Sequence, residues 1–130
     1  MNNLKPFMKI LVAHDGSAHA DKALNEAIIL AEKFEGSIIL LHVAWEKSDN
    51  DSRRLLHHAE EKLKNSNIKY KLRVERSQNP PRRIVRIAMD EDCDLIAIGS
   101  RGMSGGKAWV LGSVSSRVIE EAPCLVLVVK

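Results

Sequence analysis

The chain has 130 residues, of which 45% are hydrophobic and 28% are charged, and its formal net charge is +3. This length and composition suffice for one core of ordinary size, so we expect a single domain spanning residues 1–130. The charges are interspersed and no apolar run reaches the roughly 18 residues of a membrane span, which argues against nucleic-acid-binding and membrane-spanning proteins.

The first predicted elements are a short strand and a long helix. The N-terminal stretch MNNLKPFMKILVAHDG lacks the apolar segment and cleavage site of a signal peptide, so we expect a cytoplasmic protein. The apolar run at 9–13 (KILVA) is typical of a central parallel strand that is covered on both faces. Apolar residues then recur at helical spacing from 18 to 34, and we expect Gly36 to cap this helix at its C-terminal end.

The next segment predicts a strand, an amphipathic helix and a second strand. The run at 37–43 (SIILLHV) is apolar throughout except for one histidine, and residues 51–65 carry leucine and alanine on one side of a helix. The strand at 68–74 is more polar, so we place it at an edge of the sheet. Its apolar residues alternate with basic ones, and we expect the basic face to meet solvent.

The last third of the chain repeats the alternation of helix and strand. Asn79, Pro80 and Pro81 predict the start of a helix that runs to about residue 91, because proline is tolerated in a first helical turn. An apolar strand at 94–98, a glycine-rich loop, a helix ending near residue 121 and a strand at 125–129 follow. Alternating strands and helices predict an α/β fold, with a parallel open sheet and helices on both faces.

Two cysteines, Cys93 and Cys124, come just before the last two strands. In a parallel sheet both therefore lie at the same end. Disulfides are rare in a reducing cytosol, so we expect free thiols. Neither cysteine has a partner at CxxC or CxxH spacing, which argues against a structural zinc site.

The stretch from Gly99 to Ser116, GSRGMSGGKAWVLGSVSS, joins an apolar strand to a helix. Glycine lets the backbone approach a ligand closely, and the unpaired NH groups at a helix N-terminus suit phosphate. Two common phosphate loops are excluded by spacing. Gly106-Lys107 is followed by alanine where a Walker A loop needs Ser or Thr, and the dinucleotide pattern GxGxxG is absent.

The spacing G-x2-G-x9-G-S, formed by Gly99, Gly102, Gly112 and Ser113, resembles the ATP-binding members of the universal stress protein family. The segments KILVAHDGS, DLIAIGSRG and GSVSSRVIEEAPCLVLVV extend the resemblance over nearly the whole chain. It implies the strand order 3-2-1-4-5 in a Rossmann-like, adenine nucleotide alpha hydrolase-like fold. It also implies binding of ATP, with or without Mg2+. The chain departs from the family's usual pattern at residues 79–81, where a glycine is common.

With this strand order, two distant segments meet where the order of the sheet reverses, which is where open α/β sheets bind ligands. Asp15 ends the first strand and Gly99 ends the fourth. We expect Asp15 either to contact ribose or a divalent cation, or to cap the following helix. Gly99 and Gly102 allow close backbone approach to a ligand, or serve a tight turn.

The other candidates carry alternatives as well. By resemblance, Ala13 and Val43 line the adenine and ribose pocket, or they belong to the core. Residues 112–113 bind phosphate through NH groups and a hydroxyl, cap the last helix, or do both. Arg101 and Lys107 either pair with the phosphate charge or lie in solvent. The residues expected to bind nucleotide are Ala13, Asp15, Val43, Gly99, Ser100, Arg101, Gly102, Gly112, Ser113, Val114 and Ser115, with Asp15 also the candidate metal ligand.

Three functions remain open at this stage. The first is a nucleotide-binding regulatory protein of the stress response, in which ATP orders the loop and biases a surface that partner proteins recognise. The second is a slow ATPase that uses the same site. The third is an interaction protein that keeps the fold without nucleotide and forms a homodimer through the apolar strand at 125–129. His14 is expected to be a packed or rim side chain, and no catalytic residue is assigned.

Overall fold

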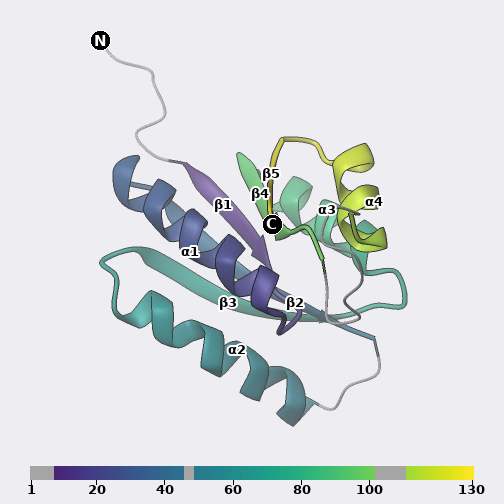
Figure 1. Ribbon diagram of the computed structural model, residues 1–130, viewed down its shortest axis with the longest axis horizontal. Helices are drawn as coiled ribbons and strands as arrows, with labels where there is room; N and C mark the ends of the chain where they lie inside the picture. The colour runs from purple at the N-terminus through teal and green to yellow at the C-terminus, as the bar shows by residue number, and fades with distance from the viewer. Residues whose placement is uncertain (1–7, 46–48, 102–110) are drawn as a thin grey trace.

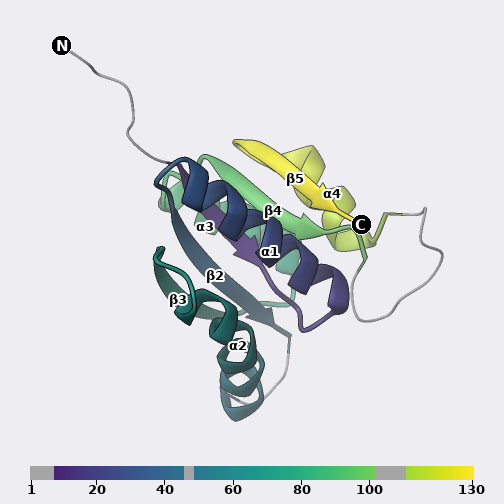
Figure 2. The ribbon, with the colours of Figure 1, turned by 60° about the vertical axis from the view of Figure 1, so that its left-hand side comes forward.

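The computed structural model describes residues 8–45, 49–101 and 111–130. Within these residues five parallel strands form one sheet of order β3-β2-β1-β4-β5, and Figure 2 shows β3 and β5 at its opposite edges. The predicted α/β class and strand order are confirmed. The elements are β1 (Lys9–Ala13), α1 (Ala18–Lys33), β2 (Ser37–Ala44), α2 (Asp49–Lys64), β3 (Lys69–Arg76), α3 (Pro80–Asp90), β4 (Leu95–Gly99), α4 (Ser113–Glu121) and β5 (Leu125–Val129).

The sheet is covered on both faces, by α1 and α2 on one and by α3 and α4 on the other (Figure 1). Successive side chains of a strand point to opposite faces, so the apolar runs feed two separate cores. Ile10 and Val12 pack in the core under α1 and α2, whereas Leu11 packs in the core under α3 and α4. All three are fully buried, as expected for a central parallel strand. No helix among the described residues is long and apolar enough to cross a membrane.

Strand β3 lies at the edge as predicted, but the prediction that its basic face meets solvent holds only for its two lysines, which are exposed. Leu72 and Val74 are each 39% exposed, while Arg73 and Glu75 on the other face are half-buried. The guanidinium of Arg73 donates to the carboxylates of Glu75 at 2.9 Å and Glu91 at 2.8 Å. The two ion pairs therefore partly cover Arg73, which the alternation of the sequence alone assigned to solvent.

The C-terminal end of α1 corrects the role expected for Gly36. Phe34 is the C-cap residue of the helix, and Glu35 takes the left-handed conformation with φ of 53°. Gly36 donates its NH to the carbonyl of Ala31 at 2.7 Å, which is the long hydrogen bond of a Schellman motif. Gly36 itself is needed for another reason, because a Cβ there would collide with the carbonyl oxygen of Met8.

This helix end gives a stability prediction. Replacing the exposed Glu35 with glycine removes the Cβ that disfavours a left-handed backbone, so Glu35→Gly should raise the free energy of unfolding by about 1 kcal/mol. Glu35→Ala keeps the Cβ and is the matched control, with little expected change. Urea denaturation measures both. Equal stability of the glycine and alanine variants would contradict this account of the helix end.

The two cysteines are free thiols, as predicted. Cys93 is buried in the core under α3 and α4, and Cys124 packs against the same core. Burial raises the pKa of Cys93 to about 11 and also raises the pKa of Cys124. Both thiols are therefore protonated at neutral pH, which makes them poor nucleophiles and poor metal ligands.

Candidate functional site

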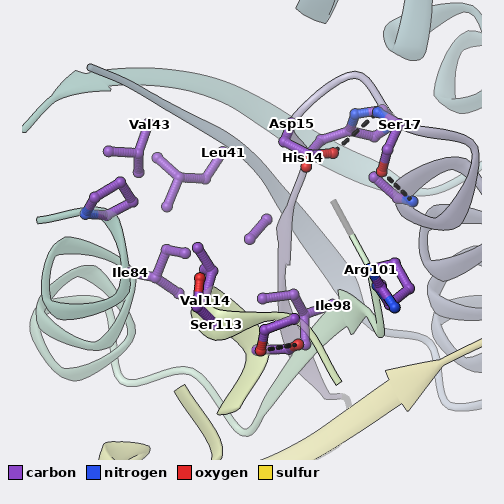
Figure 3. A pocket seen from close by; sticks show the side chains of 16 residues that line it. His14, Asp15, Ser17, Leu41, Val43, Ile84, Ile98, Arg101, Ser113 and Val114 are labelled. Atoms are coloured by element: carbon purple, nitrogen blue, oxygen red, sulfur yellow. Dashed lines mark hydrogen bonds between the residues drawn. The ribbon is translucent and has the colours of Figure 1, made fainter. Parts of the chain in front are cut away.

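The chain leaves β1 and β4 in opposite directions, because α1 covers one face of the sheet and α4 the other. A cleft of about 210 Å³ lies at the carboxyl ends of these two neighbouring strands (Figure 3). Its lining comes from β1, β2 and β4 and from the starts of α1, α3 and α4. The lining residues are Ala13, His14, Asp15, Ser17, Ala20, Leu41, Val43, Pro80, Ile84, Ile98, Gly99, Arg101, Gly112, Ser113, Val114 and Ser115.

One side of the cleft is apolar. Figure 3 shows Leu41, Val43 and Ile84 gathered there, from β2 and the first turns of α3. Pro80, at the first position of α3, lines the same cleft, so the departure from the family's usual pattern at residues 79–81 falls on the wall of the site. A flat aromatic ring can bury its faces against such a surface without a polar partner.

The opposite side carries the turn between β1 and α1. Ser17 caps α1, because its Oγ accepts a hydrogen bond from the NH of Ala20 at 3.1 Å. The alternative in which Asp15 caps this helix is therefore wrong. The Oδ1 of Asp15 accepts from the NH of Ser17 at 2.9 Å, across Gly16 with φ of 91° (Figure 3). Asp15 thus lines the cleft with its carboxylate held by the turn.

The third wall is the start of α4. Gly112 is the N-cap residue and offers no side-chain cap, and the NH of Ser116 makes the bond to the carbonyl of Gly112 at 3.0 Å. The NH groups of residues 113–115 precede the first hydrogen bond of the helix, so they have no acceptor within it. They form the positive end of the helix dipole. The hydroxyl of Ser115 is turned inward, where its one hydrogen is shared between the carbonyls of Ser100 and Gly112, each 3.2 Å from Oγ.

Gly99 and Ser100 fix the end of β4 against α1. A Cβ on Gly99 would lie 2.8 Å from the backbone carbon of His19, so α1 can approach β4 this closely only at a glycine. Ser100 is buried, and its Oγ lies 3.1 Å from Nδ1 of His19. Close packing of α1 thus accounts for Gly99, whether or not a ligand also approaches it.

Most of the sequence-predicted residues come together in the cleft. They are Ala13, Asp15, Val43, Gly99, Arg101, Gly112, Ser113, Val114 and Ser115. Ser100 does not line the cleft but supports its wall through its carbonyl, which accepts from Gly112 at 2.7 Å. Gly102 and Lys107 lie outside the described residues.

Sequence reasoning found Ala13, Val43 and Val114 but missed the rest of the apolar lining and Ser17. Leu41 and Ile98 end two buried strands, and Ile84 sits on the inner face of α3, so their pattern is the pattern of core residues. Ser17 was available in the sequence as a cap, since serine is a preferred N-cap residue. His14 is buried, as predicted, and also lines the cleft.

The side chains of the cleft suit a metal ion only when it is bound together with a polyphosphate. Among residues 8–45, 49–101 and 111–130 there is no group of three or more His, Cys, Asp or Glu side chains that could hold a metal ion. Asp15 is the one carboxylate among the cleft-lining residues. Mg2+ is commonly held by one or two carboxylates together with substrate phosphates and water, so Asp15 fits Mg2+ bound with a polyphosphate.

The strand order and the position of the cleft define an adenine nucleotide alpha hydrolase-like fold. Comparison with protein families identifies which family of this fold class the chain belongs to. The profile of the Universal stress protein family matches residues 6–130, and the chain belongs to that family.

Similar proteins agree with this assignment. Universal stress protein YxiE of Bacillus subtilis is 30% identical over 95% of this chain and 99% of its own length. The solved structure of hypothetical protein MJ0577 superposes with a TM-score of 0.84 at 30% identity, over 97% of both chains. A universal stress protein from Archaeoglobus fulgidus, solved in complex with dAMP, has a TM-score of 0.79 at 25% identity and covers 97% of this chain and 100% of its own.

Proposed function

We propose that this protein is an ATP-binding regulatory member of the universal stress protein family. The observation that carries the proposal is one cleft with an apolar side, a carboxylate and a helix N-terminus, at the switch point of the sheet. The dAMP complex of the Archaeoglobus fulgidus relative supports an adenine nucleotide as the ligand. The sequence supports a triphosphate through the complete spacing from Gly99 to Ser113.

In this proposal the nucleotide lies across the cleft. Adenine packs against Val43 and Ile84, and the phosphates meet the NH groups of residues 113–115, where the helix dipole favours negative charge. Asp15 contacts the ribose hydroxyls or Mg2+ bound to the phosphates. Arg101, which also lines the cleft, adds a guanidinium on the phosphate side.

Two further parts of the proposal concern protein partners, namely a regulated protein and a second copy of this chain. The ligand orders the cleft and biases a surface that a partner protein recognises in the cytoplasm, so the site is one of binding rather than turnover. A homodimer forms through β5, an edge strand whose residue Leu125 is 67% exposed. An exposed apolar edge of this kind is a template for pairing with a second copy.

Calorimetry with MgATP tests the binding site. The wild-type protein should bind MgATP, and Asp15→Ala should weaken binding about tenfold or more, because hydrogen bonds to a charged group are worth roughly 1.5–3 kcal/mol. Asp90→Ala is the matched control, since it removes the same charge from the solvent side of α3. Equal affinity of Asp15→Ala and wild type would remove Asp15 from the site.

A phosphate-release assay on the same preparation separates regulation from hydrolysis. The regulatory proposal expects no turnover beyond the spontaneous rate in buffer. Steady release that is lost in Asp15→Ala and kept in Asp90→Ala would favour the slow ATPase instead.

A further inference from the structure

The side chain of His14 is bonded at both ring nitrogens. It is 4% exposed, its Nδ1 lies 3.0 Å from the NH of Gly16, and its Nε2 lies 2.9 Å from Oδ1 of Asp21. A backbone NH can only donate, so Nδ1 is the acceptor. The neutral ring therefore carries its hydrogen on Nε2 and donates it to Asp21.

These bonds connect three parts of the fold around Asp15. The backbone NH of His14 donates to the carbonyl of Leu41 at 2.8 Å, and its carbonyl accepts from Nδ1 of His42 at 2.8 Å, so residue 14 is fixed to β2. Its ring reaches forward to the NH of Gly16 and to the first turn of α1. Asp15 lies between His14 and Gly16, so the bond from the NH of Gly16 to the His14 ring spans it.

We infer that His14 is a positioning residue, which holds the turn so that the Asp15 carboxylate faces the cleft before the ligand arrives. A turn that is already ordered costs less conformational entropy when a ligand binds, and the saving appears as affinity. This inference rests on the proposed function, because it assigns His14 a role in nucleotide binding through Asp15.

If His14 had a packing role alone, the loss of its hydrogen bonds would leave the affinity for nucleotide unchanged. The positioning role predicts a loss of affinity instead. An apolar side chain of similar size can fill the space of the ring, and the groups that His14 bonds can turn to water, since Gly16 is exposed and the Asp21 side chain is 34% exposed. Loss of these hydrogen bonds should then cost little stability. It should loosen the turn, and so affect affinity more than folding.

Three substitutions separate the two bonds. His14→Asn keeps an acceptor near Nδ1, in the geometry by which asparagine bonds the NH two residues ahead, but cannot reach Asp21. His14→Gln can reach toward Asp21 but offers no acceptor at the Nδ1 position. His14→Leu keeps neither bond. Urea denaturation of each variant checks that it folds, and calorimetry with MgATP measures affinity.

The inference expects His14→Leu and His14→Gln to bind MgATP about tenfold more weakly than wild type, and His14→Asn to stay within about threefold. If His14→Leu does not fold, the comparison of the asparagine and glutamine variants decides. The inference is overturned if all folded variants bind like wild type, or if the asparagine variant loses as much affinity as the glutamine variant. Failure of the wild type to bind MgATP overturns the proposed function, and this inference with it.

Discussion

Val43→Phe should weaken nucleotide binding about a hundredfold while leaving the protein folded. Val43 is half-buried on the apolar side of the cleft, where the proposal places adenine. The cleft has about 210 Å³ of space, so the larger ring can enter it without displacing the core. It then occupies the position of the base, and a steric penalty of about 3 kcal/mol corresponds to roughly a hundredfold loss of affinity. Calorimetry with MgATP measures the loss.

Ile29→Phe is the control for this experiment. It enlarges an apolar side chain in the same way, but Ile29 is 45% exposed on α1 and does not line the cleft. This variant should bind MgATP like wild type. If Val43→Phe also binds like wild type, adenine does not lie against Val43, and the proposed orientation of the nucleotide is wrong.

Gly99→Ala should destabilise the protein by about 2 kcal/mol or more and weaken nucleotide binding as well. The added Cβ would lie 2.8 Å from both the backbone carbon and the Cβ of His19, so α1 has to move away from β4. Overpacking of this kind costs typically 1–3 kcal/mol. The same movement displaces Ser17 and the Asp15 turn from the cleft. Urea denaturation and calorimetry measure the two effects.

Gly112→Ala is the matched control at the other glycine of the cleft. Its Cβ would meet its nearest neighbour, the carbonyl oxygen of Ser100, at 3.4 Å, and its φ of −70° suits any residue. We expect a loss of stability of less than about 1 kcal/mol, because the only cost is that alanine is a poorer N-cap residue than glycine. If both variants were equally stable, close packing of α1 on β4 would not be the reason for a glycine at position 99.

The fold follows from the sequence to a large extent, because its signals are local. Buried strands such as residues 9–13 are continuous apolar runs, and helices such as α3 begin at a recognisable cap with proline. The errors arose where tertiary contacts outweighed the local pattern. Arg73 is half-buried because Glu91 of a different element pairs with it, and Gly36 is required because the carbonyl of Met8 approaches it.

The polar part of the site was predictable for a different reason. Residues such as Asp15, Gly112 and Ser113 stand at the ends of elements, where their types favour turns, caps and anions. The choice between Asp15 and Ser17 as the cap of α1 was not predictable, since both types cap helices and they lie two residues apart. The residue pattern alone does not reveal the apolar lining, because Ile84 differs from a core residue only in facing a cleft. Ala13 and Val43 were predicted only through the family resemblance.

The central claim is that an adenine nucleotide joins the Asp15 turn to the start of α4. An NMR titration of the 15N-labelled protein with MgATP tests it most directly, since it follows each backbone amide in solution. We expect saturable shifts that are largest at Asp15, at residues 113–115 and at Val43, on all three walls of one cleft. Shifts confined to other surfaces, or a spectrum that MgATP leaves unchanged, would contradict the claim.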